Sequence, residues 1–576
     1  MRSCLAFLLL IALASSAWAD IFHIAQNAPN ASDQNPGTAQ QPWLTLARAD
    51  RWVEAGDTVI IHAGVYRQTL LPGNSGTAAK PIIFEAAPGE KVIITGADVI
   101  SNWQRVSGQI WAADWPYVFL IGGSDHHPDD DRDKISGRAE EVIVDGTVLR
   151  RQFLSVADMA DVPGSFVADT SAHRLYIHLP DGSDPNRHLI EAAVRSAIVG
   201  QANEVHLDYI TLRGLTFRYA ANFPQLPAVT LGGRGDVIEN CVIDAANGRG
   251  VDVGQQDAVM RNTIIENCGH TGGGAEGEHF LNENCVWVGN CWKNIDRGWD
   301  AGGFKFTESS DGIIEHCIFR KNGGPGLWLD AYDHDVTIRD NVFDQNELDG
   351  VEVEISHDIT IENNLVERNG LGHHDYPDWS VGGLRLAESY HCTLSNNSVI
   401  GNRDGITLRE QGPRLHGTAV YFNHDHVITQ NVMADNAGYQ LGFWYDNAFF
   451  GRHPAQMGEY PSDEALLDDL RQKAAAGLIP PSIYDPAKMH MTIDRNIYFA
   501  GPGEKLVLYG VPWRDRYREF DNLASFTLAT GFAAHSIATD LHGAIRAPNA
   551  GATDNFEWYK EFLATDGAQI NTDKFK

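Results

Sequence analysis

The sequence is short of positive charge. Its 44 lysines and arginines stand against 76 aspartates and glutamates, which gives a formal net charge of −32 at pH 7. Nucleic acids and anionic membranes are bound through basic surfaces, so this balance argues against both as partners. It also weighs mildly against a polyanionic substrate, unless Ca²⁺ or a local basic patch mediates the contact.

Long hydrophobic runs are missing after the first residues. Residues 1–19 have the pattern of a cleaved secretory signal peptide, with Arg2 at the positive start, an apolar run over 5–14, and Ala17 and Ala19 around the cleavage site. No later stretch reaches 18 consecutive apolar residues. We therefore expect no membrane insertion and a secreted or periplasmic mature protein.

Helical periodicity is also missing from the central part of the chain. Between Gly303 and Asn397 the sequence instead repeats every 22–34 residues or so. Each repeat is a short alternating strand, a polar bend, a second short strand and a turn rich in Asn and Gly. This pattern predicts an all-β solenoid, a right-handed parallel β-helix whose coils stack about 4.8 Å apart.

The repeat and its interruptions predict the domain organisation. Residues 100–195 break the rhythm with Asp-Gly hairpin signals, which indicate an inserted antiparallel β-sandwich-like domain. The complete prediction is a signal peptide (1–19), an N-terminal cap with the first coils (20–99, with a capping helix at 44–52), the inserted domain (100–195), the main β-helix (196–500) with active-site loops at 370–382 and 437–481, and a C-terminal closing segment (501–576).

A polar column follows the second strand of successive coils. Its predicted members are Cys241, Thr263, Cys291, Cys317, Asn341, Asn364, Asn397 and Asn431. Stacked Asn side chains can hydrogen-bond along the axis of a solenoid. We interpret the cysteines as small buried residues, with a Cys291–Cys317 disulfide as the alternative that export permits.

The first strand of each coil predicts which side chains face outward. Counted from its glycine, the second and fourth residues of each strand share one face. The outward pairs are Lys305/Thr307, Trp328/Asp330, Glu352/Glu354, Arg385/Ala387 and Thr407/Arg409. The intervening residues, such as Phe304 and Phe306, are apolar and point inward. A Trp among carboxylates and basic residues is typical of a sugar-binding site.

Asp330 and Glu354 occupy one column on adjacent coils, so their backbones are expected about 4.8 Å apart. A retaining glycosidase needs two carboxyl groups about 5–5.5 Å apart, one as nucleophile and one as acid/base. Two close carboxylates also repel each other, which raises one pKa. The alternative is that the stacked acids bind Ca²⁺ or simply face water.

Supporting roles follow from position. We expect Trp328 to stack on the sugar or shield the site, and Glu352 to bind a hydroxyl or tune Glu354. Lys305 and Arg385 flank the acid pair by one coil on either side and are expected to bind hydroxyls or hold a carboxylate ionised. His373, His374 and Trp379 are predicted substrate-binding residues of a lid, although a loop role without chemistry is the alternative for both histidines.

The segments Gly326-Leu-Trp-Leu-Asp330 and Val351-Glu-Val-Glu354-Ile-Ser resemble the paired motifs of the β-helical β-xylosidase family of glycoside hydrolases. That family also carries a β-sandwich inserted into a β-helix. The resemblance implies Asp330 as nucleophile and Glu354 as general acid/base. The chain departs from the family pattern at Ala331 and Tyr332, which puts xylose specificity in doubt.

The resulting prediction is an exported retaining glycosidase that acts on a plant or algal oligosaccharide or polysaccharide and requires no cofactor. One alternative is a lyase or epimerase of uronic-acid polymers, with a base recruited from Lys305, Arg385, Arg409 or His391. Another is a non-catalytic glycan-binding protein. The His- and Asp-rich segment 125–133 is interpreted as a solvated loop, with structural Ca²⁺ as its alternative.

Overall fold

The structure, a computed structural model, describes residues 19–122, 133–200, 206–293, 295–372, 381–410, 414–445, 489–501, 505–509 and 518–538, with isolated positions between 468 and 477. The expected signal segment, apart from its last residue, and nearly all of the His- and Asp-rich loop fall outside these residues. The expected lid residues His373, His374 and Trp379 also fall outside them. No helix among the described residues combines the length and apolar character that crossing a membrane requires.

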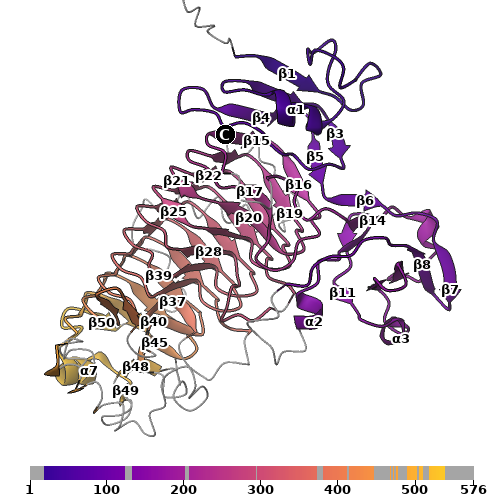
Figure 1. The fold of residues 1–576 in the computed structure, drawn as a ribbon. Coiled ribbons are helices and arrows are strands. Elements are labelled where there is room, and N and C mark those ends of the chain that lie inside the picture. The colour runs from indigo at the N-terminus through magenta and orange to yellow at the C-terminus, as the bar shows by residue number, and fades with distance from the viewer. Residues whose placement is uncertain are drawn as a thin grey trace, which may run out of the picture.

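Three long sheets wind around a common core (Figure 1). Sheet 1 has thirteen strands, from β1 (Ile21–Ile24) to β46 (Thr492–Asp494), and sheet 2 has thirteen, from β3 (Gly64–Tyr66) to β50 (Ile537–Ala538). Neighbouring strands in both sheets are parallel, as in the pairing of β32 (Thr337–Arg339) with β35 (Thr360–Glu362) in sheet 1. Each regular coil contributes one strand to each sheet. The predicted parallel β-helix is confirmed.

Sheet 3 carries the outward ladder predicted from the glycine count. Its eleven strands are β17 (Pro227–Leu231), β20 (Arg249–Val253), β24 (Gly273–Ala275), β28 (Phe304–Thr307), β31 (Leu327–Asp330), β34 (Val351–Glu354), β37 (Gly382–Ala387), β40 (Asp404–Glu410), β45 (Tyr439–Tyr445), β48 (Lys505–Tyr509) and β49 (Arg518–Phe520). All pair in parallel except β48 with β49.

Two ladders of buried asparagines tie the coils together. In each, a side-chain oxygen accepts a hydrogen bond from the backbone of the preceding coil; Asn341 N–H donates to Asn364 Oδ1 at 2.9 Å. The Asn364 amide in turn donates to the Ile338 carbonyl at 2.9 Å. The first ladder is the predicted column, continued to Asn496. The second, which the sequence analysis missed, comprises Asn290, Asn322, Asn346, Asn369, Asn402 and Asn436.

The cysteine placement corrects the predicted column in one place. Cys285, and not Cys291, precedes Cys317 in the ladder, because Cys285 N–H faces Cys317 Sγ at 3.4 Å. All six cysteines of the described residues are buried and unpaired. The alternative of a Cys291–Cys317 disulfide is therefore wrong, and the interpretation as small core residues is confirmed.

Both ends of the stack are covered. The predicted capping helix is α1 (Leu46–Trp52), which inserts Leu46 and Ala49 into the core at the first coils. At the other end α7 (Leu523–Thr530) buries Phe526 against the last coils. The repeat runs further than expected, because β45 and β48 add two more strands to sheet 3 where an excursion and an irregular tail were predicted.

Residues between Ala97 and Ala193 form two smaller sheets beside the helix (Figure 1). One contains β6 (Ala97–Val99), β9 (Val142–Val144), β10 (Thr147–Val148) and β14 (Ile190–Ala193), and the other β7 (Gln104–Ser107), β8 (Ile110–Asp114), β11 (Arg151–Gln152), β12 (Ser165–Asp169) and β13 (Arg174–His178). Most pairings are antiparallel. Their own core includes Trp103 and Trp115.

Candidate functional site

The two predicted catalytic carboxylates are direct register partners. Asp330 ends β31 and Glu354 ends β34, and the two strands pair in parallel with Asp330 opposite Glu354. The alternating residues Leu329 and Val353 are fully buried. Because alternation then sends Asp330 and Glu354 to the outer face, both side chains point to the outer face of sheet 3 on adjacent coils, where each is partly buried.

Lys305 connects the neighbouring coil to Asp330. Its Nζ lies 2.8 Å from Asp330 Oδ2 and 2.9 Å from the Trp299 carbonyl oxygen. The same ammonium lies 3.7 Å from the centre of the Trp328 ring, a cation–π contact. Asp330 therefore has a positive charge beside it while its side chain stays 19% exposed.

Trp328 does not present an open ring face to a ligand. Its side chain is 3% exposed, and Lys305 covers one face. The structure thus favours the shielding role expected for Trp328 over the stacking role. It positions the Lys305 ammonium beside Asp330.

Glu354 has the character of an acid. Burial, then the charges of Asp330 and Glu352, raise its pKa to about 7, and Arg385 and Arg409 oppose the rise without cancelling it. At neutral pH a substantial fraction of Glu354 therefore carries a proton. A retaining glycosidase needs such a protonated carboxyl group close to a second carboxyl group that acts as the nucleophile.

Glu352 and Arg385 form a buried ion pair behind Glu354. They are register partners on β34 and β37, 3% and 5% exposed, and Arg385 also lies 3.2 Å from Asp349 Oδ2. Neither side chain is placed to reach a sugar hydroxyl at the surface. Their position fits the other expected role, in which buried charge sets the electrostatics of Glu354.

A cavity of about 760 Å³ opens on the Lys305 side of Asp330. Lys305, Thr307 and Asp330 line it together with residues from earlier coils; Glu354 is on the coil beyond and is not among them. The earlier coils contribute polar groups that the sequence analysis did not single out: Gln225, Arg249, Asp252, Glu276, Trp299 and Asp300. The volume and mixed lining are typical of a small-molecule site.

Arg249 organises the floor of this cavity. Its guanidinium lies 2.9 Å from Asp252 Oδ1 and 2.6 Å from Asp300 Oδ2. Burial raises the pKa of Asp300, but Arg249, His270 and Lys305 outweigh it and lower the pKa to about 2. The cavity therefore holds a fixed carboxylate close to Lys305.

Strand register shows which of the additional cavity residues the sequence could have predicted. Asp252 pairs with Gly274, which pairs with Lys305, so Asp252 continues the Lys305 column two coils earlier. A side chain at Gly274 would meet Arg249 and the Asp252 carboxylate within about 3 Å. Extending the glycine count backwards by two coils predicts Asp252; nothing in the repeat predicts Trp299 or Asp300.

The backbone is strained immediately after Asp330. Ala331 has a φ of 58° and Tyr332 a φ of 80°, the only two consecutive non-glycine residues in the left-handed region among the described residues. Such conformations cost energy and cluster at functional sites. They stand where the sequence departs from the motif of the family that it resembles.

A second acid pair lies on sheet 2. Asp244 ends β19 (Val242–Asp244), Glu266 ends β23 (Ile264–Glu266), and the two are register partners beside a cavity of about 870 Å³. This cavity lies between the β-helix and the inserted domain, and Arg150 and Trp292 are among the residues that line it. Burial raises the pKa of Asp244, and burial and then Asp244 raise that of Glu266 to about 7.

Comparison with known families and proteins agrees with the fold. A family model described as "Right handed beta helix region" matches residues 198–380, and one described as "Periplasmic copper-binding protein (NosD)" matches residues 332–448. Each covers under half of the chain. The first match supplies the handedness, so the architecture is a right-handed parallel β-helix.

Two curated relatives align with the chain. "Uncharacterized protein YwoF" of Bacillus subtilis (strain 168) is 25% identical over 327 residues, which are 52% of this chain and 69% of the relative. "Alpha-1,3-galactosidase A" of Akkermansia muciniphila is 34% identical over 94 residues, only 15% of either chain.

Among solved structures, XylC in complex with xylose superposes with a TM-score of 0.63 at 19% identity, covering 84% of both chains. At this identity the likeness shows the fold alone. The A-module of the mannuronan C-5 epimerase AlgE6 of Azotobacter vinelandii reaches a TM-score of 0.46 at 13% identity, over 84% of this chain and 91% of its own. That value is too low to carry an argument.

Proposed function

We propose that this protein is an exported retaining glycoside hydrolase, β-xylosidase-like, that acts on plant or algal oligosaccharides or polysaccharides. The observation that carries the proposal is the register pairing of Asp330 with Glu354. One member has a lysine 2.8 Å away and lines a cavity, and the other has a pKa of about 7. The fold shared with XylC and the short alignment with a galactosidase support a sugar substrate.

The reaction proceeds in two displacements. The Asp330 carboxylate attacks the anomeric carbon, and Glu354 gives its proton to the leaving glycosidic oxygen as the C–O bond breaks. A covalent glycosyl ester on Asp330 results. Glu354, now a carboxylate, takes a proton from water, whose oxygen attacks the anomeric carbon and releases Asp330 with overall retention of configuration.

The surrounding residues divide the remaining work. Lys305 balances the charge of Asp330 before the attack and after the ester is released. Arg249, Asp252 and Asp300 form a fixed polar floor on which sugar hydroxyls bind. Glu352 keeps negative charge behind Glu354 and so favours its protonated form.

A panel of aryl glycosides identifies the sugar, and a 2-deoxy-2-fluoro analogue of the best substrate tests the mechanism. The fluorine slows release of the glycosyl ester, so the ester accumulates. We expect a mass increase of one sugar on the peptide that contains Asp330, and none in Asp330→Asn. Asp244→Asn is the matched control and should label normally. A label on another residue, or hydrolysis with inversion, contradicts the proposal.

The lyase or epimerase alternative is tested with the same protein. Uronate polymers would yield an unsaturated end that absorbs ultraviolet light, or a changed uronate composition. Two of the four basic residues considered for that chemistry are constrained, since Lys305 is paired with Asp330 and Arg385 with Glu352 and Asp349. Ultraviolet-absorbing products without glycoside hydrolysis would overturn the hydrolase assignment.

A further inference from the structure

A ladder of rings follows the bends between sheet 3 and sheet 1. His334, His357, Tyr390 and His424 stack with ring centroids 5.0, 4.8 and 4.9 Å apart. Three of the four are histidines, and each of these is followed by an aspartate whose carboxylate lies 2.6–2.8 Å from the ring Nδ1. The His–Asp pair is therefore a repeated device that fixes the bend.

The residues after the four rings form a second column in the left-handed conformation, and His490, which follows Met489, continues it on the next coil. Its members are Asp335, Asp358, His391, Asp425 and His490, all with φ between 52° and 55°. The column consists of aspartates until His391 and then alternates. Asp425 is consequently the one described member with a histidine on the coil before it, a histidine on the coil after it and a histidine beside it.

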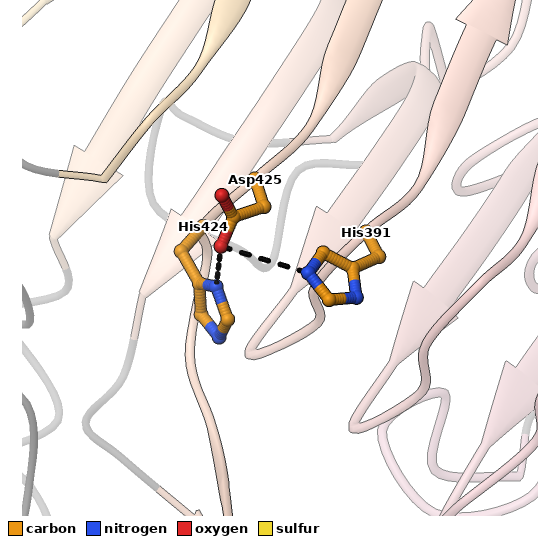
Figure 2. Close-up of side chains that lie close together, drawn as sticks. All are labelled: His391, His424 and Asp425. Carbon is orange, nitrogen blue, oxygen red and sulfur yellow. Dashed lines mark hydrogen bonds and ion pairs between the residues drawn. The ribbon is translucent and has the colours of Figure 1, made fainter.

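Three imidazoles surround the Asp425 carboxylate. Oδ2 lies 2.6 Å from His424 Nδ1 and 3.7 Å from His391 Nε2, and Oδ1 lies 3.5 Å from His490 Nδ1. Figure 2 shows Asp425 with dashed lines to the rings of His424 and His391. Donor atoms of His391, His424 and Asp425 all lie within 4.8 Å of one another.

A second carboxylate stands behind His391. This carboxylate belongs to Asp358, whose Oδ1 lies 3.7 Å from His391 Nδ1. The other ring nitrogen of His391, Nε2, faces Asp425. A histidine that ligates a metal commonly gives its other ring N–H to a carboxylate, which fixes the ring and increases its basicity. Asp358 is placed for that task, and its presence leaves Nε2 of His391 free to ligate.

We propose that His391, His424 and Asp425 form a site for a divalent transition-metal ion, Zn²⁺ or Cu²⁺. Imidazole nitrogens with one carboxylate suit these ions, whereas Ca²⁺ and Mg²⁺ prefer sets made of oxygen. Bonds of about 2.0–2.1 Å place tetrahedral ligands about 3.3 Å apart, so donor atoms that lie within 4.8 Å of one another reach the ion by side-chain shifts of up to about 1.5 Å.

The site is open to solvent and shares no residue with the acid pair. The His391 and His490 side chains are 49% and 74% exposed, and that of His424 is 18% exposed. An ion can therefore enter without rearrangement of the backbone. Because the ligands come from two successive bends, the bound ion would tie the two coils together.

Metal binding to the full chain tests the proposal. After removal of metals with a chelator, the protein is titrated with Zn²⁺ or Cu²⁺, and bound metal is measured by dialysis and elemental analysis. We expect one ion per chain, an increase in Tm, and at least about tenfold weaker binding in His391→Asn and in Asp425→Asn. Asparagine tolerates the left-handed backbone of both positions.

His334→Gln is the matched control. It removes an imidazole from the same ladder, but its bend has only aspartates in the second column on either side. Binding in this variant should equal that of the unsubstituted protein. The proposal fails if no ion binds at unit stoichiometry, if His391→Asn and Asp425→Asn both retain it, or if His334→Gln weakens it equally. Circular dichroism of each variant separates lost binding from lost folding.

Discussion

Two regions of the molecule carry acid pairs of the same construction. On sheet 3 Asp330 faces Glu354, and on sheet 2 Asp244 faces Glu266; each pair joins strands of adjacent coils beside a cavity. The pairs differ in their surroundings. Asp330 has the Lys305 ammonium 2.8 Å away, whereas no ion pair to Asp244 or Glu266 occurs among the described residues.

This difference separates two kinds of carboxylate pair. On sheet 2 burial raises the pKa of both members, so both move towards the neutral form. On sheet 3 a cation stands beside one member, and the pKa of the other is raised to about 7. Register alone therefore does not distinguish the two pairs. In the function proposed above, the Lys305 ammonium beside Asp330 is what separates the nucleophile from the acid.

The largest expected contrast is between the two glutamates. Glu354→Gln should lower kcat/KM about 10³-fold on a substrate with a poor leaving group, since general acid catalysis contributes about 10²–10⁴-fold. An activated aryl glycoside, which needs little protonation, should lose much less. Glu266→Gln should stay within about threefold of the unsubstituted enzyme on both substrates. Equal losses in the two variants would erase the distinction between the pairs.

A smaller contrast is expected between two cations that lie over tryptophan rings. Lys305 lies 3.7 Å from the ring centre of Trp328, and Arg150 lies 5.1 Å from that of Trp292. Lys305→Met is one atom shorter but stays unbranched and apolar; it removes the charge beside Asp330 and should lower kcat/KM about 10–100-fold. Arg150→Met should leave it unchanged. If Arg150→Met lowered kcat/KM as much as Lys305→Met, the substrate would bind in the cavity beside Asp244 and Glu266, and the proposed site would be wrong.

The alkaline limb of the pH dependence of activity should report Glu354. Because its pKa is about 7, the protonated fraction falls above neutral pH, and kcat/KM should fall about tenfold per pH unit on the alkaline side. The limb should vanish from the residual activity of Glu354→Gln. It should persist unchanged in Glu266→Gln, although the pKa of Glu266 is also raised to about 7.

The smallest expected effect is on stability, where the two pairs behave alike. Both glutamates have folded-state pKa values near 7, against 4.5 as the ordinary value. The folded state thus holds more protons between about pH 4.5 and 7, and stability falls as the pH rises through that window. Each Gln variant should reduce the loss of Tm between pH 5 and pH 8 by about 2 °C. A Gln variant that steepens the loss would contradict the direction of the shift.

The repeat made much of the fold and the acid pair predictable. Alternation from each glycine placed Asp330 and Glu354 on one outward column, because the side-chain period of a strand is fixed at two. The period says which face a side chain takes but not how deep it lies. For that reason Trp328, with Lys305 packed over it, was not recognisable as a buried residue.

Other misses came from irregular coils. The coil that ends at Phe304 is longer than its neighbours, which shifted the ladder assignment from Cys285 to Cys291. Gly274 interrupts the Lys305 column and so concealed its continuation to Asp252. Asp300 lies outside the strands, where no period applies, and only three-dimensional placement brings it to Arg249.

The two asparagine ladders also bear on how the molecule yields to mechanical load. Each asparagine amide is hydrogen-bonded to the asparagines of the neighbouring coils. Detaching one coil therefore breaks its own bonds and leaves those between the following coils intact. Pulled from one end in an optical trap, the solenoid would be expected to unzip in a staircase of similar steps, each about as long as one winding, and not in a single rupture.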